Sequence, residues 1–530
     1  CSVETAELHP TAYTAAARLL INERSTSSKA VACVLRVLDG DGRELGRRNI
    51  RINEFEEKLT YQDFTFTFPV EKTTEATFEI YWPGTNYVRV SEFGIMSKTN
   101  ASLPDFSVTG ASLLGADIEE TVEYNESSLY FFDLYNYMVT RAADAEEQYD
   151  IANLICTLQG LVNRNGERLF VRFVAANNFS DDVDGFWLNY LTQDGQFLAD
   201  KEVVTVQSPM TLLTLFKDYY KGFAAWDPAV PATVNAVATA CGADDLLPVR
   251  YSTVRNSLYW YINNNDAFAD KEMKVDLGEK FTGDGTIYET EIPSTGSRKN
   301  DAYLWAKAKY LQNMYLSNRD YYIANKAFFF DLSPMEFEIP DDDPDQQYID
   351  TDNGTIDYAT FTAIMREQAA YAESVDASKP IDVGGFTPWH LKYTRFTNPV
   401  ASGEVAYEWE TAWLFSIFNA YINADAPSYT AMANASVYQH FPMKDSYTQA
   451  GDKTVKESLP GAGEQGANYL LFYMGDFDAS AWLNTAMTKL WTDPKRGEIP
   501  LCWTFSLDIA KRAGHVVDMM YSTATENDYF

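Results

Sequence analysis

The sequence predicts three parts: an N-terminal β-sandwich, an α/β region with a parallel sheet, and a C-terminal domain that resembles a (β/α) barrel. Residues 12–96 alternate apolar and polar side chains with no competing helical period. Strand and helix patterns alternate after residue 127, and from residue 256 onward the strands end on polar or aromatic residues. The chain has 530 residues, 46% of them hydrophobic, which is enough for several cores. At roughly 150 residues per domain, three or four domains are expected.

The N-terminal domain is predicted to span residues 1–110. The segment "KAVACVLRVLDGDGREL" (29–45) is an apolar run, a turn and a polar return, which is typical of a β-hairpin. "DFTFTFPV" alternates as a half-buried strand does, and residues 77–95 give two more strands. The aromatic segment "YWPGTNY" resembles the last hairpin of jelly-roll carbohydrate-binding modules, so this sandwich is a candidate module of that kind.

A linker is expected near residues 97–127, followed by an α/β region over 127–255. Residues 145–164 have apolar side chains at helical spacing, and "RLFVRFV" reads as a buried strand. Ser208 and Pro209 mark the cap and first position of a further helix. This alternation indicates a parallel sheet. The region has no G-x-G-x-x-G or P-loop motif, so a nucleotide site is not indicated.

The third part, residues 256–530, repeats one pattern in which an apolar strand ends on a polar or aromatic residue and a helix follows. The strands are "KAFFFDLSP", "PIDVGGFTPWH", "FNAYINADAP", "NYLLFYMGDFD" and "IPLCWTFS". Helices are expected over 355–373, 404–417 and 479–491. Parallel strands joined by helices pack as sheets or barrels, and ligand sites gather at the strand C-termini.

Asp476 and Asp478 are the leading catalytic candidates. They end the apolar run "YLLFYMGDFD", which is predicted to be a buried strand. Residues i and i+2 of a strand face the same way, about 6.5 Å apart. Carboxyl pairs that cleave glycosidic bonds are separated by roughly 5 to 9.5 Å. Asp478 also precedes a helix, so it could serve as an N-cap instead.

Other strand ends supply further candidates. Asp425 and Asp331 are possible catalytic partners, although both precede turn or helix-start sequences. The expected substrate-binding residues are aromatic side chains and one histidine near the same ends: Trp389, His390, Trp503 and Tyr473. Trp389 and Trp503 would be the platforms on which sugar rings stack.

Composition excludes several classes of partner. The net charge of −34 argues against nucleic acid and against an anionic membrane surface. Aromatic residues make up 15% of the chain, which suits ligands such as sugars. The four histidines form no cluster, so no metal centre and no cofactor are expected. The acidic segment 340–357 loosely resembles a calcium loop, but a solvated loop is the favoured interpretation.

Cysteine usage bears on location. The five cysteines show no C-x-x-C spacing, so four are expected as buried free thiols. Cys1 stands first, as in a processed lipoprotein, or it simply marks the start of the chain. A lipid on Cys1 would be the only membrane attachment, because no run of 18 apolar residues exists. The expectation is a periplasmic or cell-surface lipoprotein, attached to the outer membrane.

Seven segments in order resemble one family of proteins. They are "TLQGLVNRNGERLFV", "YLWAKAKYL", "FFFDLSP", "GGFTPWHLKYT", "ANASVYQHFP", "FYMGDFDASAW" and "IPLCWTFS". Together they resemble the GxGYxYP family, secreted Bacteroidetes proteins described as glycoside hydrolases, over residues about 128–530. The motif that names the family does not occur here; the resemblance would place it just after "TENDYF". The resemblance implies an α/β region followed by a barrel-like domain, and it assigns no catalytic residues.

These observations favour a glycoside hydrolase that acts on a poly- or oligosaccharide through strand-end carboxylates. Asp476 would be the general acid or nucleophile, with Asp425 or Asp478 as its partner. The alternative is a glycan-binding surface lipoprotein without catalysis, in which the aspartates bind sugar hydroxyls and the tryptophans stack. A calcium-stabilised scaffold is a third possibility. The sequence leaves the sugar, the linkage and the oligomeric state open.

Overall fold

The computed structural model divides the chain into two compact units. Unit 1 comprises Cys1–Val108 and Arg141–Gln148, and unit 2 comprises Thr109–Thr140 and Tyr149–Phe530. The residues that the structure describes are 2–22, 29–40, 42–70, 72–82, 87–97, 110–142, 145–173, 182–254, 257–311, 319–330, 332, 353–384, 408–423, 433–449, 470–475, 480–505 and 509–530.

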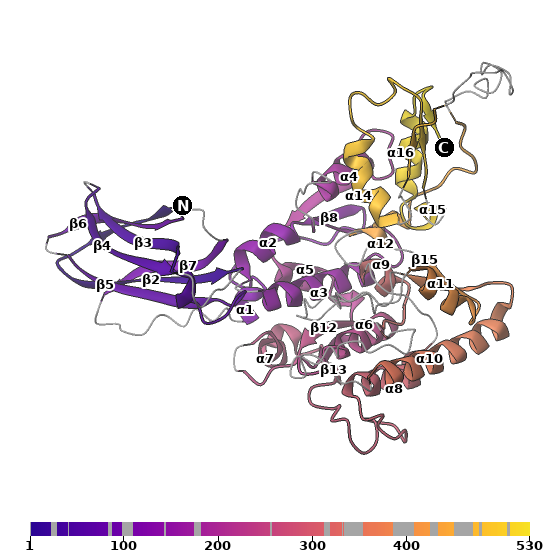
Figure 1. Ribbon diagram of the computed structural model, residues 1–530, viewed down its shortest axis with the longest axis horizontal. Coiled ribbons are helices and arrows are strands. Elements are labelled where there is room, and N and C mark those ends of the chain that lie inside the picture. Colours follow the sequence, from indigo (N-terminus) through magenta and orange to yellow (C-terminus); the bar gives the residue numbers. More distant parts are fainter. Residues whose placement is uncertain are drawn as a thin grey trace. The chain divides into compact units, whose positions relative to one another are not determined.

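Unit 1 contains two antiparallel sheets, as the sequence predicts (Figure 1). One sheet has the order β1-β6-β3-β4 and the other β5-β2-β7. The strands are β1 (Ser2–Leu8), β2 (Thr11–Ile21), β3 (Val31–Asp39), β4 (Glu44–Arg51), β5 (Gln62–Val70), β6 (Thr74–Tyr81) and β7 (Val88–Ser97), with the 3₁₀ turn η1 (Ile52–Glu54) after β4. The predicted hairpin over 29–45 is the β3–β4 pair.

The core of unit 1 follows from the strand alternation. In β6 the side chains of Ala76, Phe78 and Ile80 are buried, while the residues between them lie nearer the surface. Phe64 and Phe68 of β5 point into the same core. Two facing sheets, each with one apolar side, bury those sides against each other.

The segment 110–127, expected as part of a linker, packs against unit 2 instead. It includes the short helix α1 (Gly110–Leu113), and the side chains of Leu113 and Leu114 are buried. The backbone carbonyl of Leu113 accepts a hydrogen bond of 2.9 Å from the Tyr137 hydroxyl. The Glu120 carboxylate accepts hydrogen bonds from the backbone N–H groups of Gln207 and Ser208. Glu120 therefore fixes this segment to the start of α5.

The first sheet of unit 2 is parallel, with the order β10-β8-β9. Its strands and the neighbouring helices are β8 (Ser128–Phe132), α2 (Leu134–Arg141), α3 (Ala145–Val162), β9 (Leu169–Val171), α4 (Val183–Leu191), β10 (Glu202–Val206), α5 (Pro209–Leu215) and η2 (Lys217–Tyr219). Ser208 caps α5 by accepting a hydrogen bond from the Thr211 N–H at 3.0 Å, as predicted.

The second parallel sheet has the order β12-β11-β13. The elements of this region are β11 (Gly222–Trp226), α6 (Thr233–Asp244), β12 (Leu246–Arg250), α7 (Leu258–Asn264), η3 (Asp266–Phe268), β13 (Met273–Asp276), α8 (Arg298–Tyr310) and α9 (Arg319–Ala324). Helix α6 is almost entirely buried, because it lies between this sheet and helices α8 and α9. The predicted α/β alternation is thus confirmed.

The remaining described strands form two small parallel sheets, β14-β15 and β16-β17-β18. The elements are α10 (Asn353–Asp376), β14 (Ile381–Gly384), α11 (Glu408–Ser416), β15 (Ala420–Asn423), α12 (Ala435–Tyr438), β16 (Tyr473–Met474), α14 (Ser480–Leu490), β17 (Leu501–Trp503), α15 (Ile509–Arg512), α16 (Gly514–Thr523) and β18 (Asp528–Tyr529). Within the described residues these sheets are separate, and the barrel-like arrangement stays a prediction.

A buried polar contact fixes the segment before α12 to the first sheet of unit 2. Asn434 has a left-handed backbone conformation, with φ 71°. Its Oδ1 accepts hydrogen bonds from Gln159 Nε2 and the Val171 N–H, both at 2.7 Å. Its Nδ2 donates to the Val171 carbonyl at 2.8 Å and to Asp184 Oδ1 at 3.1 Å. Both polar atoms of this amide are satisfied by partners 250 to 275 residues away in the sequence.

Apolar contacts join the same parts of unit 2. The indole of Trp187 in α4 is fully buried and donates to the backbone carbonyl of Asn484 in α14 at 2.9 Å. Residues of β8, β9 and α4 share one core with α12, α14, β17 and α16. No helix in the described part of the chain is both long and apolar enough to cross a bilayer. Cys33, Cys156 and Cys241 are buried and Cys502 is half-buried, and these four cysteines are not in disulfide bonds.

Candidate functional site

Most of the sequence-predicted site residues lie outside the described part of the structure. This holds for all four catalytic candidates, Asp331, Asp425, Asp476 and Asp478. It also holds for Trp389, His390 and Cys1, and for most of the acidic segment 340–357. Their roles stay predictions.

The apolar run before Asp476 is not a buried strand. Leu470, Leu471 and Phe472 are 79%, 75% and 46% exposed, and Tyr473 is 61% exposed. Strand β16 covers Tyr473–Met474, and among the described strands it pairs on one side only, with β17. The side chain of Tyr473 therefore stays accessible to a ligand, as its predicted substrate-binding role requires.

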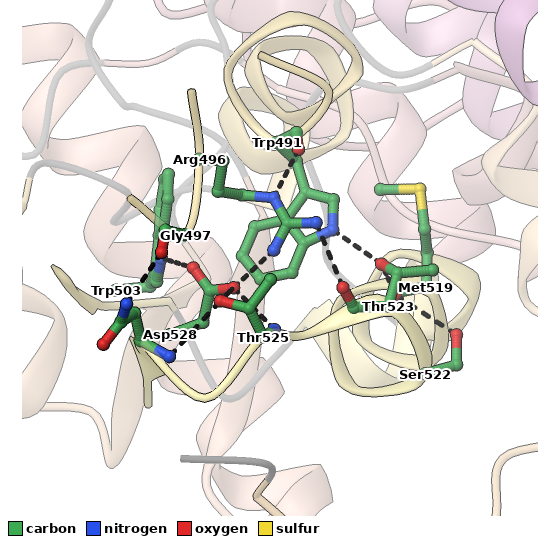
Figure 2. A network of polar contacts seen from close by, with 10 residues as sticks. Trp491, Arg496, Gly497, Trp503, Met519, Ser522, Thr523, Thr525 and Asp528 are labelled. Carbon is green, nitrogen blue, oxygen red and sulfur yellow. Dashed lines mark hydrogen bonds and ion pairs between the residues drawn. The ribbon is translucent and has the colours of Figure 1, made fainter. Parts of the chain in front are cut away.

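Trp503 cannot be the predicted sugar platform, because its indole is only 3% exposed. The ring contacts Trp491, with ring centroids 5.1 Å apart. Its Nε1 donates a hydrogen bond of 2.9 Å to Oδ1 of Asp528 (Figure 2). An indole this deeply buried has no surface on which a sugar ring could stack. The aromatic residue at this strand end belongs to the core.

A group of charged side chains lies at the C-terminal edge of the first parallel sheet, where ligands commonly bind. Arg172 follows β9 and donates to Asp133 Oδ2 and Asp182 Oδ2, each at 2.9 Å. The other oxygen of each carboxylate accepts a backbone N–H, from Asn136 and Gly185 respectively. All four carboxylate oxygens have partners, so this cluster holds the loops together.

The second parallel sheet has a similar group at its C-terminal edge. Asp227 follows β11, and its two oxygens accept the backbone N–H groups of Ala229 and Glu279. Asp276 ends β13; it accepts the N–H of Gly278 at 3.0 Å and the Tyr259 hydroxyl at 2.7 Å. These carboxylates are likewise occupied by structural hydrogen bonds.

Asp382 in β14 differs from these carboxylates. It pairs in register with Tyr421 of β15, and Gly384 pairs with Asn423. Because alternate residues of a strand face the same side, Asp382, Tyr421 and Asn423 lie on one face of this two-stranded sheet. Oδ2 of Asp382 lies 3.5 Å from Asn423 Nδ2. Oδ1 is buried and has no hydrogen-bond partner among the described residues.

Two cationic side chains of α15 act on Asp382. Arg512 is fully buried, and its Nη1 donates to the Tyr322 hydroxyl at 2.7 Å. Burial raises the pKa of Asp382, since it disfavours the charged form more than its neighbours favour it. Hydrogen bonds from Tyr421 and Asn423, and the positive charges of Lys511 and Arg512, lower the pKa by smaller amounts. The net shift is upward.

A carboxyl group with a raised pKa holds its proton at a higher pH than an ordinary aspartate does, as a general acid must. Asp382 is not among the sequence-predicted site residues, because those residues lie at the ends of strands and Asp382 lies inside one. The available signal was the carboxylate between Ile381 and Val383, since both apolar neighbours are buried and a charge inside such a strand is costly. No sequence pattern around Lys511 and Arg512 indicated that these residues belong to the site.

Other features of the described residues do not add to this site. A hollow of about 440 Å³ lies beside β13 and α8 and is lined by residues that include Lys274, Glu289 and Trp305. A groove of about 800 Å³ lies beside α5 and is lined by residues that include Tyr124 and Tyr219. Asp382 is in neither lining. In the part of the chain that the structure describes, no group of three His, Cys, Asp or Glu side chains could hold a metal ion.

The C-terminal part of the chain matches one family. Residues 466–530 match the family model described as "GxGYxYP putative glycoside hydrolase C-terminal domain". The match includes Tyr473, β16–β18 and the Asp528 contacts of Figure 2. It agrees with the resemblance noted in the sequence. No curated protein matches this chain.

Among solved structures, the chain is similar in fold to a "putative hydrolase" from Bacteroides thetaiotaomicron. The TM-score is 0.50 and the sequence identity 15%; the likeness covers 76% of this chain and 62% of that one. A sugar-binding EclA C-terminal domain matches over 18% of this chain and 66% of its own length, at 11% identity. A family 35 carbohydrate-binding module from an environmental isolate matches over 19% of this chain and 68% of its own length, at 17% identity. Both have a TM-score of 0.12, too low to bear on the fold.

Proposed function

We propose that this protein is a glycoside hydrolase that acts on a poly- or oligosaccharide, with Asp382 as the general acid. The observation that carries the proposal is Asp382 on the polar face of β14 and β15, where burial raises the pKa of this carboxyl group and its buried Oδ1 has no hydrogen-bond partner among the residues that the structure describes. The family matched over residues 466–530 and the fold neighbour are both described as hydrolases, which supports the reaction class.

The reaction needs a proton at the glycosidic oxygen as the bond to the anomeric carbon breaks. The protonated Asp382 would supply it and become a carboxylate. Asn423 and the positive charges of Lys511 and Arg512 favour that carboxylate, so they stabilise the charge that develops on the acid. Water then completes the hydrolysis, and the acid regains its proton.

A second carboxylate is required as nucleophile or base. Asp425 is our first choice, since it follows Asn423 by two residues in the sequence "YINAD". Asp476, Asp478 and Asp331 are the other candidates from the strand-end pattern. Tyr473, which is exposed, and Trp389 and His390 are proposed to contact the sugar.

The test is the release of reducing ends from a panel of plant and host glycans by wild type and Asp382→Asn. Loss of a general acid typically lowers the rate by ~10² to 10⁴. We expect Asp382→Asn to show such a loss with an unchanged circular dichroism spectrum. Asp425→Asn should cause a loss of similar size.

Asp376→Asn is the matched control, because Asp376 ends α10 and bonds Ser378 at the surface. Its activity should equal that of wild type. Full activity of Asp382→Asn on a cleaved glycan would overturn the assignment. Binding of glycans without any release of reducing ends would favour a glycan-binding protein instead.

A further inference from the structure

The hollow beside β13 and α8 lies entirely within unit 2. Its volume of about 440 Å³ falls within the range of about 300 to 1,000 Å³ that small-molecule sites occupy. Residues of β13, of the loop between β13 and α8, and of α8 itself line it, and three of them are aromatic: Tyr288, Trp305 and Tyr310. We call this space the α8 hollow. It is large enough to hold a small ligand.

A tight turn in the loop between β13 and α8 holds Glu289 at the α8 hollow. The backbone N–H of Ile287 donates to the Ile292 carbonyl at 2.8 Å, and the Ile287 side chain is buried. Glu289 has a left-handed backbone conformation, with φ 52°. A residue with a Cβ adopts this conformation at a cost in stability, and such residues cluster at ligand sites. The turn thus fixes the Glu289 carboxylate beside α8, where it forms an ion pair with Lys309.

Trp305 brings a hydrogen-bond donor to the same carboxylate. Its indole is only 1% exposed, and the Lys309 ammonium lies 4.7 Å from the centre of the ring. The pKa of Glu289 is lowered, mainly by Lys309, and to a smaller extent by Tyr288 and Trp305. The Nε1 of Trp305 nevertheless makes no hydrogen bond with any residue that the structure describes. A buried indole N–H usually has a partner, so the lining of the α8 hollow contains a donor that an acceptor on a ligand would satisfy.

The charges around the α8 hollow balance. Three lysines and three acidic residues line it: Lys221, Lys274, Lys309, Asp244, Asp276 and Glu289. The lysines are in ion pairs with carboxylates, and Asp244 accepts the Tyr310 hydroxyl at 3.2 Å. An anion or a cation would have to compete with these pairs. A neutral hydroxyl both donates and accepts, so adjacent hydroxyls can bond to both members of a pair without separating the two charges.

We infer that the α8 hollow binds a neutral saccharide of one or two sugar units, at a site separate from that around Asp382. The choice of a sugar among neutral ligands rests on the proposed function. One hydroxyl accepts from Trp305 Nε1 and donates to Glu289, and its neighbour accepts from Lys309. The half-buried rings of Tyr288 and Tyr310 offer apolar surface to the C–H groups of the sugar.

The test is calorimetric titration of the full chain with cellobiose, maltose, mannobiose and lactose, and with glucuronic acid and glucosamine as charged probes. We expect at least one neutral disaccharide to bind. Lys309→Met should bind it roughly tenfold more weakly, and Trp305→Phe, which removes the N–H but keeps an aromatic ring, roughly three- to tenfold more weakly. Lys307→Met is the matched control, because Lys307 also lies on α8 and pairs with a glutamate, Glu367, but does not line the hollow. Its affinity should equal that of wild type.

The outcomes separate this inference from the proposed function. Lys309 is partly exposed, so Lys309→Met tests the site even if Trp305→Phe does not fold. Binding that is weakened in Lys309→Met but not in Lys307→Met or Asp382→Asn supports the inference, even if no glycan is hydrolysed. Three results would overturn it: no binding of any neutral disaccharide, equal affinity of Lys309→Met and wild type, or tighter binding of glucuronic acid or glucosamine than of every neutral probe. Hydrolysis of a glycan alongside any of these three would leave the proposed function in place.

Discussion

The indole Nε1 of Trp503 and the carboxylate of Asp528 are joined by a buried hydrogen bond of 2.9 Å, and Asp528 is completely inaccessible to solvent. The other oxygen of this carboxylate accepts the N–H and hydroxyl of Thr525 at 2.8 and 2.9 Å and forms an ion pair with Arg496 (Figure 2). Arg496 also donates to the carbonyl groups of Trp491 and Thr523. A buried charge with this many donors is stable, and it holds β17 against β18.

We predict that Trp503→Phe destabilises the protein without affecting glycan binding. The change removes one hydrogen bond to a buried carboxylate, which typically costs about 1.5 to 3 kcal/mol. Asp528→Ala should cost about 3 to 5 kcal/mol, since it leaves Arg496 without its ion-pair partner. Urea unfolding followed by fluorescence measures both. If a folded Trp503→Phe protein lost affinity for glycans, Trp503 would be a sugar-stacking residue after all, contrary to what its burial implies.

The Asn434 contact gives a second prediction. Asn434→Ala removes four buried hydrogen bonds and places an alanine at φ 71°, so it should lower the free energy of unfolding by about 3 to 5 kcal/mol. Asn434→Gly loses the same hydrogen bonds but tolerates the left-handed backbone. It should therefore be about 1 to 2 kcal/mol more stable than the alanine variant. Equal stability of the two variants would show that backbone conformation is unimportant here.

The next prediction concerns His515 and the pH dependence of the free energy of unfolding. Burial lowers the pKa of His515 to about 3, and its ring packs on Trp187 with centroids 4.4 Å apart. Because the pKa is lower in the folded state than in the unfolded state, near 6.5, the neutral ring favours folding above pH 6.5. This contribution is lost as the pH falls toward 3. Between pH 7 and pH 5 the loss is about 2 kcal/mol.

The measurement is urea unfolding of wild type and His515→Phe at these two pH values. The wild type should lose about 2 kcal/mol more than the variant on acidification. His9→Phe is the control for the substitution itself, because His9 is exposed in unit 1. Equal pH dependence of His515→Phe and wild type would show that His515 does not contribute.

Much of the fold follows from local pattern. The hairpin of residues 29–45, the Ser208 cap, and the strands "GFAAW" and "LLPVR" all appear where alternation and capping predict them. These elements depend on neighbours in sequence, or on burial that an apolar run makes evident. The linker prediction failed beyond residue 110 because Glu120 and Leu114 contact residues about 90 positions away.

The candidate site was less predictable. Trp503 was expected at a ligand face because it ends a strand, but its partner Asp528 is 25 residues further on and has no signal of its own. The run before Asp476 was expected to be buried because it is apolar, yet its short strand lies at a sheet edge. Asp382 depends on a desolvated environment built from β15 and α15, which single-sequence pattern does not contain.

The final prediction concerns the pH dependence of hydrolysis. A general acid must be protonated, so kcat/KM should fall as the pH rises through the pKa of Asp382. Lys511 lowers that pKa by its charge, and Lys511→Met removes this effect. The alkaline limb of the pH–rate profile should therefore move to higher pH. Lys489→Met, at the end of α14, should leave the limb in place. Two results would mean that another group supplies the proton. One is an alkaline limb that shifts to lower pH in Lys511→Met, and the other is a limb that stays in place in this variant while Asp382→Asn is inactive.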